Sequence, residues 1–449
     1  MEEVKRRDFL KLIGAGAASV SVLGAIPLLH GEFRYLRKRT KNMYAGMVAY
    51  DRTVRSTCAG NCTQACGWDA YVKGNMVTGL VQASDYDVYD PAAKGAYNPR
   101  GCQRGASFVK YIHGPARIRH PYKRVGKRGE GKFKRISWDD AMKGIAKQTG
   151  DIIEKDGADS LVFFSPIPAY NYISAGAGYR LANVLGASGP LSFYDWYCDL
   201  PPGDPITWGT QTEESEEWDW TNAEELIFWG SNFAETRMAA AHFVTESKYR
   251  GTNLVYIGTD FTATARIADE FISVTPGTDS ALTNGVINHI ISKKIYDKEY
   301  VKLFTDMPFL VKNNDGKFLR ENDIVNGGSP FKLYVMDNNS NKPQIAPGCC
   351  GDTRESLDLQ KFGINPALEG EWSVDLINGE QVKVKTVFSR LKESIKDKTP
   401  EWAAKTAGIS ADTVRNLAER VASKKTTIVG GGGVNHWYNN DVNNRSMIL

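Results

Sequence analysis

The sequence lacks three features that would each place it in a familiar class. Its net charge is only +4 over 449 residues, so its composition gives no sign of a nucleic-acid-binding protein. No GxGxxG stretch follows a predicted strand and opens a helix, which excludes a standard NAD site. Beyond the first thirty residues, no segment is long and apolar enough to cross a membrane. With 42% hydrophobic and 24% charged residues, the composition is that of a globular protein, long enough for about three domains.

The N-terminus has the layout of a targeting segment. The charged start MEEVKRRDFLK contains Arg6 and Arg7, and an uncharged apolar stretch runs from Leu12 to Leu29. The order RR-D-F-L-K predicts a twin-arginine export signal, with an amphipathic N-terminal helix as the alternative. No small-x-small cleavage site is clear before Glu32. Because this route carries folded proteins, often with a cofactor already inserted, the signal favours a metal or cluster site downstream.

Composition and pattern divide the rest of the chain. The signal and its linker occupy residues 1–45, and a small cysteine-bearing domain follows at 46–125. An α/β domain spans 126–310, and 311–449 hold an insertion and the start of a further α/β region. In the second region, alternating segments at 68–73 and 76–82 predict a hairpin that turns at Gly74-Asn75. The stretch 311–375 is polar and without period, so we expect an irregular insertion there.

From about residue 136 the pattern becomes that of an α/β protein. A helix begins after Ser137, its predicted N-cap, with acidic residues in its first turn. Short apolar strands then alternate with helices, and the last residues, RSMIL, read as the start of another helix. This order predicts a doubly wound, largely parallel sheet. The predicted strands lie at 160–165, 225–232 and 253–260, with a short one from Glu270 and a further one from Thr426.

Four of the seven cysteines have the spacing of cluster ligands. Cys58, Cys62 and Cys66 lie within nine residues, and Cys102 follows 36 residues after the third. One short loop that wraps three corners of a cubane, with a fourth thiolate from a second loop, is the pattern of a [4Fe–4S] cluster. A zinc site and a pair of disulfides are the alternatives, although zinc sites usually have close cysteine pairs at both ends and three crowded cysteines pair poorly.

Two other features involve cysteines or their neighbours. Arg104 lies two residues after Cys102, where it is placed to form a cationic bridge from the cluster to an anionic cofactor. Cys349 and Cys350 are adjacent and cannot easily ligate one metal, so we interpret this pair as incidental.

Glycine follows or ends four of the predicted strands. These turns read GSN at 230–232, GTD at 258–260, PGTD at 276–279 and GGGG at 430–433. Glycine permits close backbone approach, and helix N-termini favour phosphate, so the strand ends of an open α/β sheet are where nucleotides bind. Four such turns predict a large phosphorylated ligand across several strand ends. The candidate residues are Gly230, Ser231, Asn232, Asp260, Gly277, Thr278 and Asp279.

The stretch LSFYDWYCDLPP, residues 191–202, places two aspartates in a stiff, apolar setting. Aspartate is rarely buried unless it is paired or coordinates a metal. Residues 191–202 alone leave both roles open for Asp195 and Asp199.

Arg117 to Lys134, RIRHPYKRVGKRGEGKFK, form a basic run. We interpret it as a solvated, glycine-rich surface loop, with an anion channel or a docking face for another subunit as alternatives.

Several of these segments together resemble a known family. The export signal, the C-x3-C-x3-C…C unit, RISWDDAMKGIA, GSN…TR and PGTDSAL resemble the molybdopterin oxidoreductases of the dimethyl sulfoxide reductase family. More narrowly, SPIPAYNYISAGAGYR, SFYDWYCDLPP, WGTQT, AHFVTE, FTDMP and GVNHWYNND look like the catalytic subunit of respiratory nitrate reductases and the similar nitrite oxidoreductases. The resemblance covers about residues 50–310 and 395–449.

The resemblance implies roles for the aspartate stretch. It implies that Asp199 coordinates molybdenum, which a hard carboxylate oxygen suits, and that Pro201-Pro202 hold its loop in place. Tyr197 is then expected near the substrate path. Asp195 is expected to be a hydrogen-bonded support, and Cys198 a small buried residue.

The resemblance also implies the fold and the cofactors. The expected fold is α/β, with a small N-terminal [4Fe–4S] domain followed by doubly wound, mostly parallel molybdopterin-binding domains, truncated at the C-terminus. The expected cofactors are a [4Fe–4S] cluster and molybdenum bound to two molybdopterin guanine dinucleotides, which the strand-end turns would hold. Asn435 and His436 in VNHWY match a cofactor-side motif.

Finally, the resemblance implies an exported oxyanion oxidoreductase, with nitrate as the first expectation for its substrate. The expected partners are an iron–sulfur electron-transfer subunit and a membrane haem subunit, which would hold the chain at the outer face of the cytoplasmic membrane or in the periplasm. Nitrite oxidation, selenate or chlorate reduction, a non-catalytic electron-transfer module and a zinc-stabilised binding module are the alternatives.

The chain departs from the family pattern in two respects. Cys58 stands where typical membrane-bound nitrate reductases have histidine, which would change the potential of the cluster. Family members are also much longer, so we expect a fragment or one half of a split gene.

Overall fold

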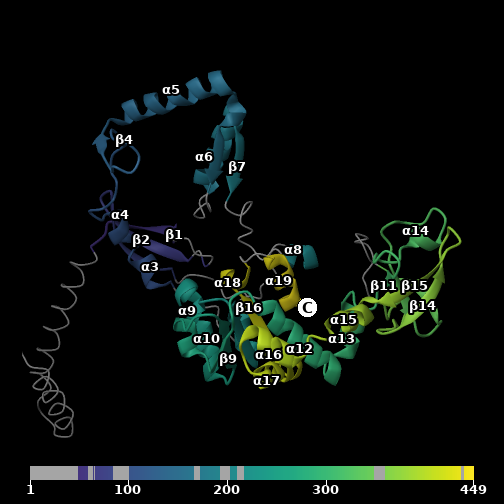
Figure 1. The fold of residues 1–449 in the computed structure, drawn as a ribbon. Coiled ribbons are helices and arrows are strands. Elements are labelled where there is room, and N and C mark those ends of the chain that lie inside the picture. The colour runs from purple at the N-terminus through teal and green to yellow at the C-terminus, as the bar shows by residue number, and fades with distance from the viewer. Residues whose placement is uncertain are drawn as a thin grey trace, which may run out of the picture. The chain divides into compact units, whose positions relative to one another are not determined.

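The computed structural model of the chain describes residues 49–58, 64, 66–83, 101–165, 172–192, 203–209, 217–347, 359–435 and 439–449. The chain divides into two compact units, one made mainly of residues up to 138 and the other mainly of residues 139–449 (Figure 1). In the described part of the chain, no helix is both long and apolar enough to span a membrane. Several predicted features lie outside the described residues: the export signal, Cys62, Asp195, Tyr197, Cys198, Asp199, Cys349, Cys350 and His436.

The first unit is built around a three-stranded antiparallel sheet. Its strands pair in the order β1-β2-β3, with bounds Arg52–Thr57, Gly67–Lys73 and Met76–Gln82. The predicted hairpin is confirmed, because β2 and β3 are joined by Gly74, whose φ of 57° favours glycine. The Gly74 amide donates to an Asp51 carboxylate oxygen at 2.6 Å, which fixes the turn to the start of β1. Two short helices follow the sheet: α3, Gln103–Ala106, and α4, Phe108–Ile112.

The basic run is a β-hairpin, so its interpretation as a loop is wrong in part. Strands β4 (Tyr122–Arg124) and β5 (Phe133–Arg135) pair antiparallel, and only the residues between them form the glycine-containing turn. A hydrogen bond from the Val125 amide to the Lys132 carbonyl, 3.0 Å long, extends the pairing toward that turn.

The second unit contains the predicted parallel sheet. Four parallel strands pair in the order β10-β9-β8-β16, with bounds Glu270–Ser273, Asn253–Gly258, Glu225–Trp229 and Thr426–Gly430. All five residues of β8 are buried, as expected for a central strand covered on both faces. The strand β16 comes from far along the chain and pairs directly with β8.

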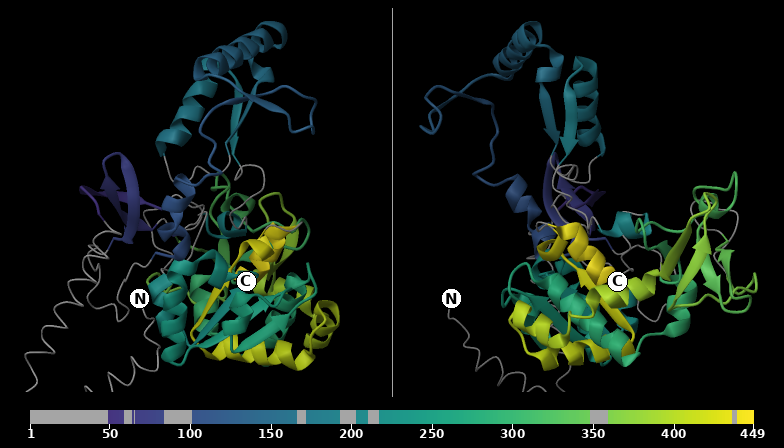
Figure 2. Two further views of the ribbon diagram at one scale, coloured as in Figure 1. Left: turned by 90° about the vertical axis from the view of Figure 1, so that its left-hand side faces the viewer. Right: turned by 45° about the vertical axis from the view of Figure 1, so that its right-hand side comes forward.

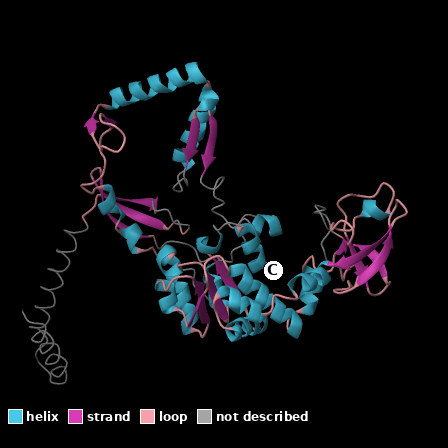
Figure 3. Cartoon of the chain, in the orientation of Figure 1, coloured by secondary structure: helices cyan, strands magenta, loops and turns pink. Residues whose placement is uncertain are grey.

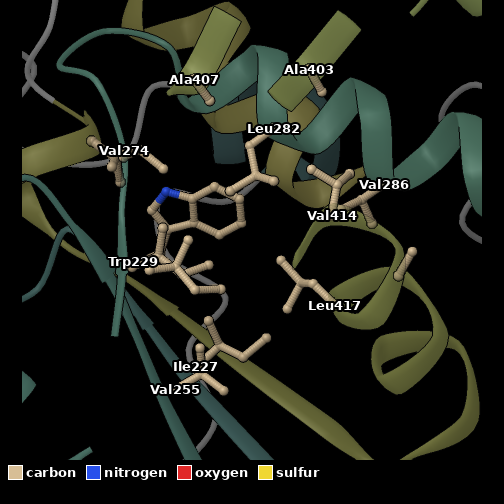
Figure 4. Packing of buried hydrophobic residues seen from close by; sticks show 14 residues of the cluster. Ile227, Trp229, Val255, Val274, Leu282, Val286, Ala403, Ala407, Val414 and Leu417 are labelled. Atoms are coloured by element: carbon tan, nitrogen blue, oxygen red, sulfur yellow. The ribbon is translucent and has the colours of Figure 1, made fainter. Parts of the chain in front are cut away.

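Helices cover both faces of this sheet, which makes it doubly wound (Figure 2). On one face, Ile227, Trp229 and Val255 pack against α12 (Asp279–Lys293), α16 (Pro400–Ala407) and α17 (Ala411–Ser423), as Figure 4 shows. Ile257 belongs to the same cluster. On the other face, Leu226, Phe228 and Leu254 pack against α9 (Phe233–Thr236), α10 (Ala241–Tyr249) and α11 (Ala263–Ile267). Because side chains alternate along a strand, odd and even positions of β8 enter different cores.

Local signals in the sequence set the ends of these helices. Thr399 accepts a hydrogen bond from the Trp402 amide at the start of α16, and Pro400 occupies the first helical position. Gly408 ends α16 with φ 73°, and Ser410 caps α17 through the Thr413 amide. The helix α5, Trp138–Asp156, begins directly after Ser137, as predicted.

Two strands stand apart from the main sheet. The predicted strand at 160–165 is β6 (Val162–Ser165), and it pairs in parallel with β7 (Ser188–Ser192) in a two-stranded sheet, joined through α6 (Tyr172–Leu185). The prediction of a strand is confirmed, but β6 does not join the four-stranded sheet.

The prediction that residues 311–375 are irregular is wrong. This region supplies strands of two small antiparallel sheets, seen as magenta arrows in Figure 3. The first has the order β11-β15-β14, with bounds Leu310–Lys312, Gln381–Thr386 and Glu371–Asp375, and the second pairs β12 (Tyr334–Asp337) with β13 (Lys342–Ile345). Their apolar side chains share a core of residues distant in sequence, including Leu310, Leu319, Tyr334, Val374 and Val384. Because these contacts join residues far apart in sequence, no periodic hydrophobic pattern within one segment predicts them.

Candidate functional site

The cysteine region is organised by one tryptophan. The Cys58 amide donates to the Cys66 carbonyl at 2.8 Å, so the backbone brings these two cysteines together across β1 and β2. Trp68, two residues later, is 4% exposed, and its indole lies against the segment that carries Cys102. A Cβ atom at Gly105 would lie 2.5 Å from this ring. The glycine therefore lets the Cys102 segment approach the strand that follows Cys66.

Cys58, Cys66 and Cys102 are all half-buried and belong to the same compact unit. Within the described ranges, no three His, Cys, Asp or Glu side chains are gathered as a metal site, and the fourth predicted ligand, Cys62, lies outside those ranges. Arg104 is exposed in α3, with its carbonyl accepting from the Ser107 hydroxyl at 3.2 Å. The ligand set and the bridging role of Arg104 stay predictions. No sequence pattern had pointed to Trp68 or to the glycine at 105.

The parallel sheet brings the predicted glycine turns to one edge. Since β8, β9, β10 and β16 are all parallel, their carboxyl ends lie on the same side of the sheet. The turns at 230–232, 258–260, 276–279 and 430–433 follow those ends. This is the edge where open α/β sheets bind nucleotides. We call it the glycine edge.

At the end of the glycine edge formed by β8 and β16, two turns pack backbone against backbone. Gly230 has φ 59°, and its carbonyl accepts from the Gly433 amide at 3.2 Å. A Cβ atom at Gly431 would lie 2.5 Å from the Gly230 carbonyl oxygen, and one at Gly230 would lie 2.6 Å from Val434. The turn after β8 and the turn after β16 can therefore meet only because these positions lack side chains.

The polar residues of this edge fall into two groups. Asn232 uses its amide within the protein: its nitrogen donates to Glu235 at 2.7 Å, and its oxygen accepts from the Thr264 hydroxyl at 3.0 Å. Asn232 therefore holds the turn, and Ser231 beside it is buried. Asp260, by contrast, is exposed at the end of β9.

The start of α12 has a buried carboxylate. Asp279 is 5% exposed, and its Oδ1 accepts from the Trp229 indole N–H at 2.7 Å. Burial raises the pKa of Asp279, although the hydrogen bond from Trp229 opposes this shift. Thr278, the residue before the helix, donates its hydroxyl to the Thr275 carbonyl at 2.6 Å, and Gly277 has φ 77° with open space around it. The exposed Gly277 leaves the backbone here accessible to a ligand.

The glycine edge also contains a buried side-chain oxygen that has no hydrogen-bond partner among the described residues. Asn435 ends α18 (Gly432–Asn435) and is 3% exposed, and its Oδ1 has no hydrogen-bond partner among the described residues. A buried polar atom left unpaired is costly, so this oxygen points to a donor from outside the described chain.

A polar seam that the sequence did not reveal supports this edge. Helix α19, Asn440–Ile448, packs against α12 through hydrogen bonds from Ser280 to Asn443 at 2.7 Å and from Thr283 to Ser446 at 2.8 Å. Asn443 also donates to the Val434 carbonyl at 2.9 Å. The seam thus connects α12, which follows the turn at 276–279, to the turn after β16.

Comparison with known proteins gives two family matches. Residues 51–114 match the molybdopterin oxidoreductase Fe4S4 domain, and residues 117–448 match molybdopterin oxidoreductase. These matches support a [4Fe–4S] cluster and a molybdopterin cofactor, which confirms the predicted cofactor classes and the fold class. The glycine edge fits such a group, because Gly277 is exposed with open space around it and the buried Oδ1 of Asn435 has no partner among the described residues.

The chain is similar to two curated subunits over nearly its whole length. It is 39% identical to the respiratory nitrate reductase subunit alpha of Haloferax mediterranei, over 99% of this chain and 47% of that protein. It is 38% identical to the perchlorate reductase subunit alpha of Dechloromonas aromatica, over 100% of this chain and 50% of that protein. The chain thus spans about half the length of these relatives. Acetylene hydratase from Pelobacter acetylenicus shares the fold, with a TM-score of 0.55 and 21% identity over 87% of this chain and 42% of that structure.

Proposed function

Because the chain belongs to the molybdopterin oxidoreductase family, we propose that it is the cluster-bearing and pterin-binding part of an oxyanion reductase, with nitrate as the substrate. Nitrate would be reduced to nitrite and water with two electrons and two protons. Bound molybdenum supplies the chemistry of oxygen-atom and two-electron transfer. The glycine edge is the observation that carries the proposal, since four strand ends lie on one side of the sheet, where a large phosphorylated cofactor would bind, and Asn435 beside them has a buried Oδ1 with no partner among the described residues.

Within this proposal each predicted residue has a role. Cys58, Cys62, Cys66 and Cys102 would ligate the cluster, and Arg104 would neutralise negative charge between the cluster and the pterin. Asp199 would be the protein ligand of molybdenum, with Tyr197 beside the substrate. The backbone amides at the glycine turns and at the start of α12 would hold phosphate groups, because helix N-termini carry partial positive charge. His436 and Asn435 would contact the cofactor at the turn after β16.

Electron supply and location are further parts of the proposal. An iron–sulfur partner subunit would deliver electrons to the cluster, and a membrane haem subunit would hold the assembly at the membrane. The twin-arginine segment would export the folded protein, so the site would operate on the outer side of the cytoplasmic membrane.

The similarity to a perchlorate reductase subunit supports a second candidate substrate class, the chlorine oxyanions. Nitrate and chlorate or perchlorate all present oxygen atoms to the same kind of metal centre. Fold and cofactor do not separate them, so the substrate must be measured.

The decisive experiment is metal analysis of the purified full-length product of this gene region, followed by oxyanion reduction with reduced viologen as the electron donor. We expect about four iron atoms and one molybdenum per chain, from one cubane and one metal centre. Nitrate-dependent viologen oxidation should be lost in Asp199→Ala, with the iron content unchanged. Iron without molybdenum would refute the enzyme proposal and leave a non-catalytic electron-transfer module. Zinc without iron would refute both.

A further inference from the structure

The proposed chemistry leaves the basic hairpin, residues 117–135, without a role. We infer that one face of this hairpin is the docking surface for the electron-donating partner subunit, which would present an acidic patch to it. The inference rests on the proposed function, because that function needs a protein that delivers electrons. It names the surface of this chain that receives that protein.

The hairpin concentrates positive charge. Residues 117–135 contain nine arginines and lysines and a single glutamate, whereas the whole chain has a net charge of only +4, so the rest of the chain is net negative. All nine basic side chains are exposed. The one glutamate, Glu130, already lies 3.3 Å from the Lys132 ammonium. Such a field attracts an acidic surface and speeds its encounter with the hairpin.

Strand register sorts the hairpin into two different faces. Tyr122 lies opposite Arg135, and Arg124 lies opposite Phe133, and these four side chains share one face because they are two residues apart along each strand. Tyr122 is 54% exposed and Phe133 is 59% exposed. Aromatic residues and arginine are the types enriched at the centres of protein interfaces. We call these four residues the aromatic–arginine face.

The other face carries a repulsion that the hairpin does not itself relieve. Lys123 lies directly opposite Lys134, and like charges in this position destabilise a strand pair. A two-stranded hairpin exposed on both faces is also only marginally stable in water. An acidic partner docked on the aromatic–arginine face would offset the second of these costs, since it would cover the exposed aromatic rings.

The arrangement favours a protein over a lipid surface or a nucleic acid. A membrane-binding element gathers its apolar side chains into one patch that can enter the lipid. Here each aromatic ring is opposite an arginine, so the face has no continuous apolar patch. The low net charge of the chain does not favour nucleic acid. The hairpin also belongs to the compact unit that contains the three described cysteines, which is where electrons would enter.

The test uses the full-length protein and its co-produced iron–sulfur subunit. The double variant Arg124→Glu/Arg135→Glu reverses the charge of the aromatic–arginine face, and Tyr122→Ala/Phe133→Ala removes its rings. The matched control is Lys147→Glu/Lys155→Glu on α5, where both side chains are also highly exposed, at 75% and 80%. Affinity for the immobilised partner subunit is measured at low and high salt. Iron content and viologen-driven oxyanion reduction are measured for every variant.

We expect the charge-reversed variant to bind the partner subunit at least about tenfold more weakly, with a smaller dependence on salt. The ring-less variant should also bind more weakly, and the control should bind as the wild type does. Iron content and viologen-driven reduction should not change, because viologen bypasses the partner.

Three results would overturn the inference. Both face variants could bind the partner as tightly as the control does. They could instead lose binding to phosphatidylglycerol vesicles with partner affinity intact, which would assign the hairpin to the membrane. They could lose only self-association in sedimentation, which would assign it to a second copy. Absence of viologen-driven reduction in the wild type would refute the proposed function, while the affinity measurement would still decide the docking surface.

Discussion

Replacing Arg420 by alanine should destabilise the second unit strongly, because Glu225 would stay buried without its main partner. Glu225 begins β8 and is fully buried. The Arg420 Nε in α17 lies 3.0 and 3.1 Å from the two carboxylate oxygens of Glu225, and its Nη2 lies 2.6 Å from Glu270 on β10. Burial lowers the pKa of Arg420, but the two glutamates outweigh it and leave that pKa raised. One guanidinium thus connects a helix to two strands.

The size of the effect follows from this burial. Removing one partner of a buried ion pair costs about 3–5 kcal/mol, because the other charge is left uncompensated. We expect the lower end, about 3 kcal/mol, for two reasons. The Arg420 side chain is 23% exposed, and Glu225 keeps two weaker partners, the Asn253 amide at 3.1 Å and the Lys424 ammonium at 3.5 Å. A loss of this size is roughly a hundredfold change in the folding equilibrium and a large part of an ordinary domain's stability.

Urea unfolding followed by tryptophan fluorescence would measure this loss, since Trp220 and Trp229 are buried, one beside the sheet and the other in β8. The control is Arg415→Ala in the same helix. Arg415 pairs at the surface with Asp412 at 2.7 Å and is 34% exposed, so its loss should cost less than about 1 kcal/mol. Equal losses for the two arginine variants would refute the reasoning. So would wild-type stability in Arg420→Ala.

Two further predictions concern the glycine edge. Gly431→Ala would place a Cβ atom 2.5 Å from the Gly230 carbonyl oxygen. We therefore expect a loss of about 1–3 kcal/mol in the free energy of unfolding, measured in urea. We also expect the variant to retain less pterin, measured by pterin fluorescence after release. Asp279→Asn should raise the melting temperature at neutral pH, because the buried carboxylate has a raised pKa and an asparagine oxygen can still accept from Trp229. A raised pKa means that the fold favours protonated Asp279. The stability that this preference adds is complete below the unfolded-state pKa of about 4 and is lost as the pH rises through the folded-state pKa. The melting temperatures of the wild type and Asp279→Asn should therefore become equal in acid.

Each of these variants has a clear contrary outcome. Gly144→Ala in α5, where a Cβ atom would meet nothing within 4 Å, is the control for the glycine change, and equal pterin retention in both variants would contradict the close-packing argument. A lower melting temperature for Asp279→Asn at neutral pH would show that the charge at the start of α12 outweighs its burial.

The sheet could be predicted because its signals are local. Each strand from Glu225 to Ser273 is a short apolar run that ends near glycine, and each is followed by a helix with its own start and stop residues. The insertion could not be predicted in the same way. Its core joins Leu310 to Val384 through residues such as Tyr334, and none of these contacts produces a period within one segment.

The candidate site divides along the same line. Sequence spacing alone indicated the cysteine cluster and the glycine turns, because ligand spacing and glycine content are properties of short segments. Three features were not predicted: Trp68 packed against Gly105, the Asp279–Trp229 hydrogen bond, and the Asn435 oxygen that has no partner among the described residues. Each of these three features depends on which distant segment packs against the residue, and no short stretch of sequence specifies that partner.

By itself, the sequence determined the class of the protein: an α/β chain with cluster-type cysteines and glycine-terminated strands, since these follow from residue type and short-range order. Only the tertiary structure decided that β16 pairs with β8, which brings the turns at 230–232 and 430–433 into backbone contact. It also decided which face of the basic hairpin combines aromatic rings with arginines. Both outcomes depend on strand register, and register is set by packing between segments rather than by any one of them.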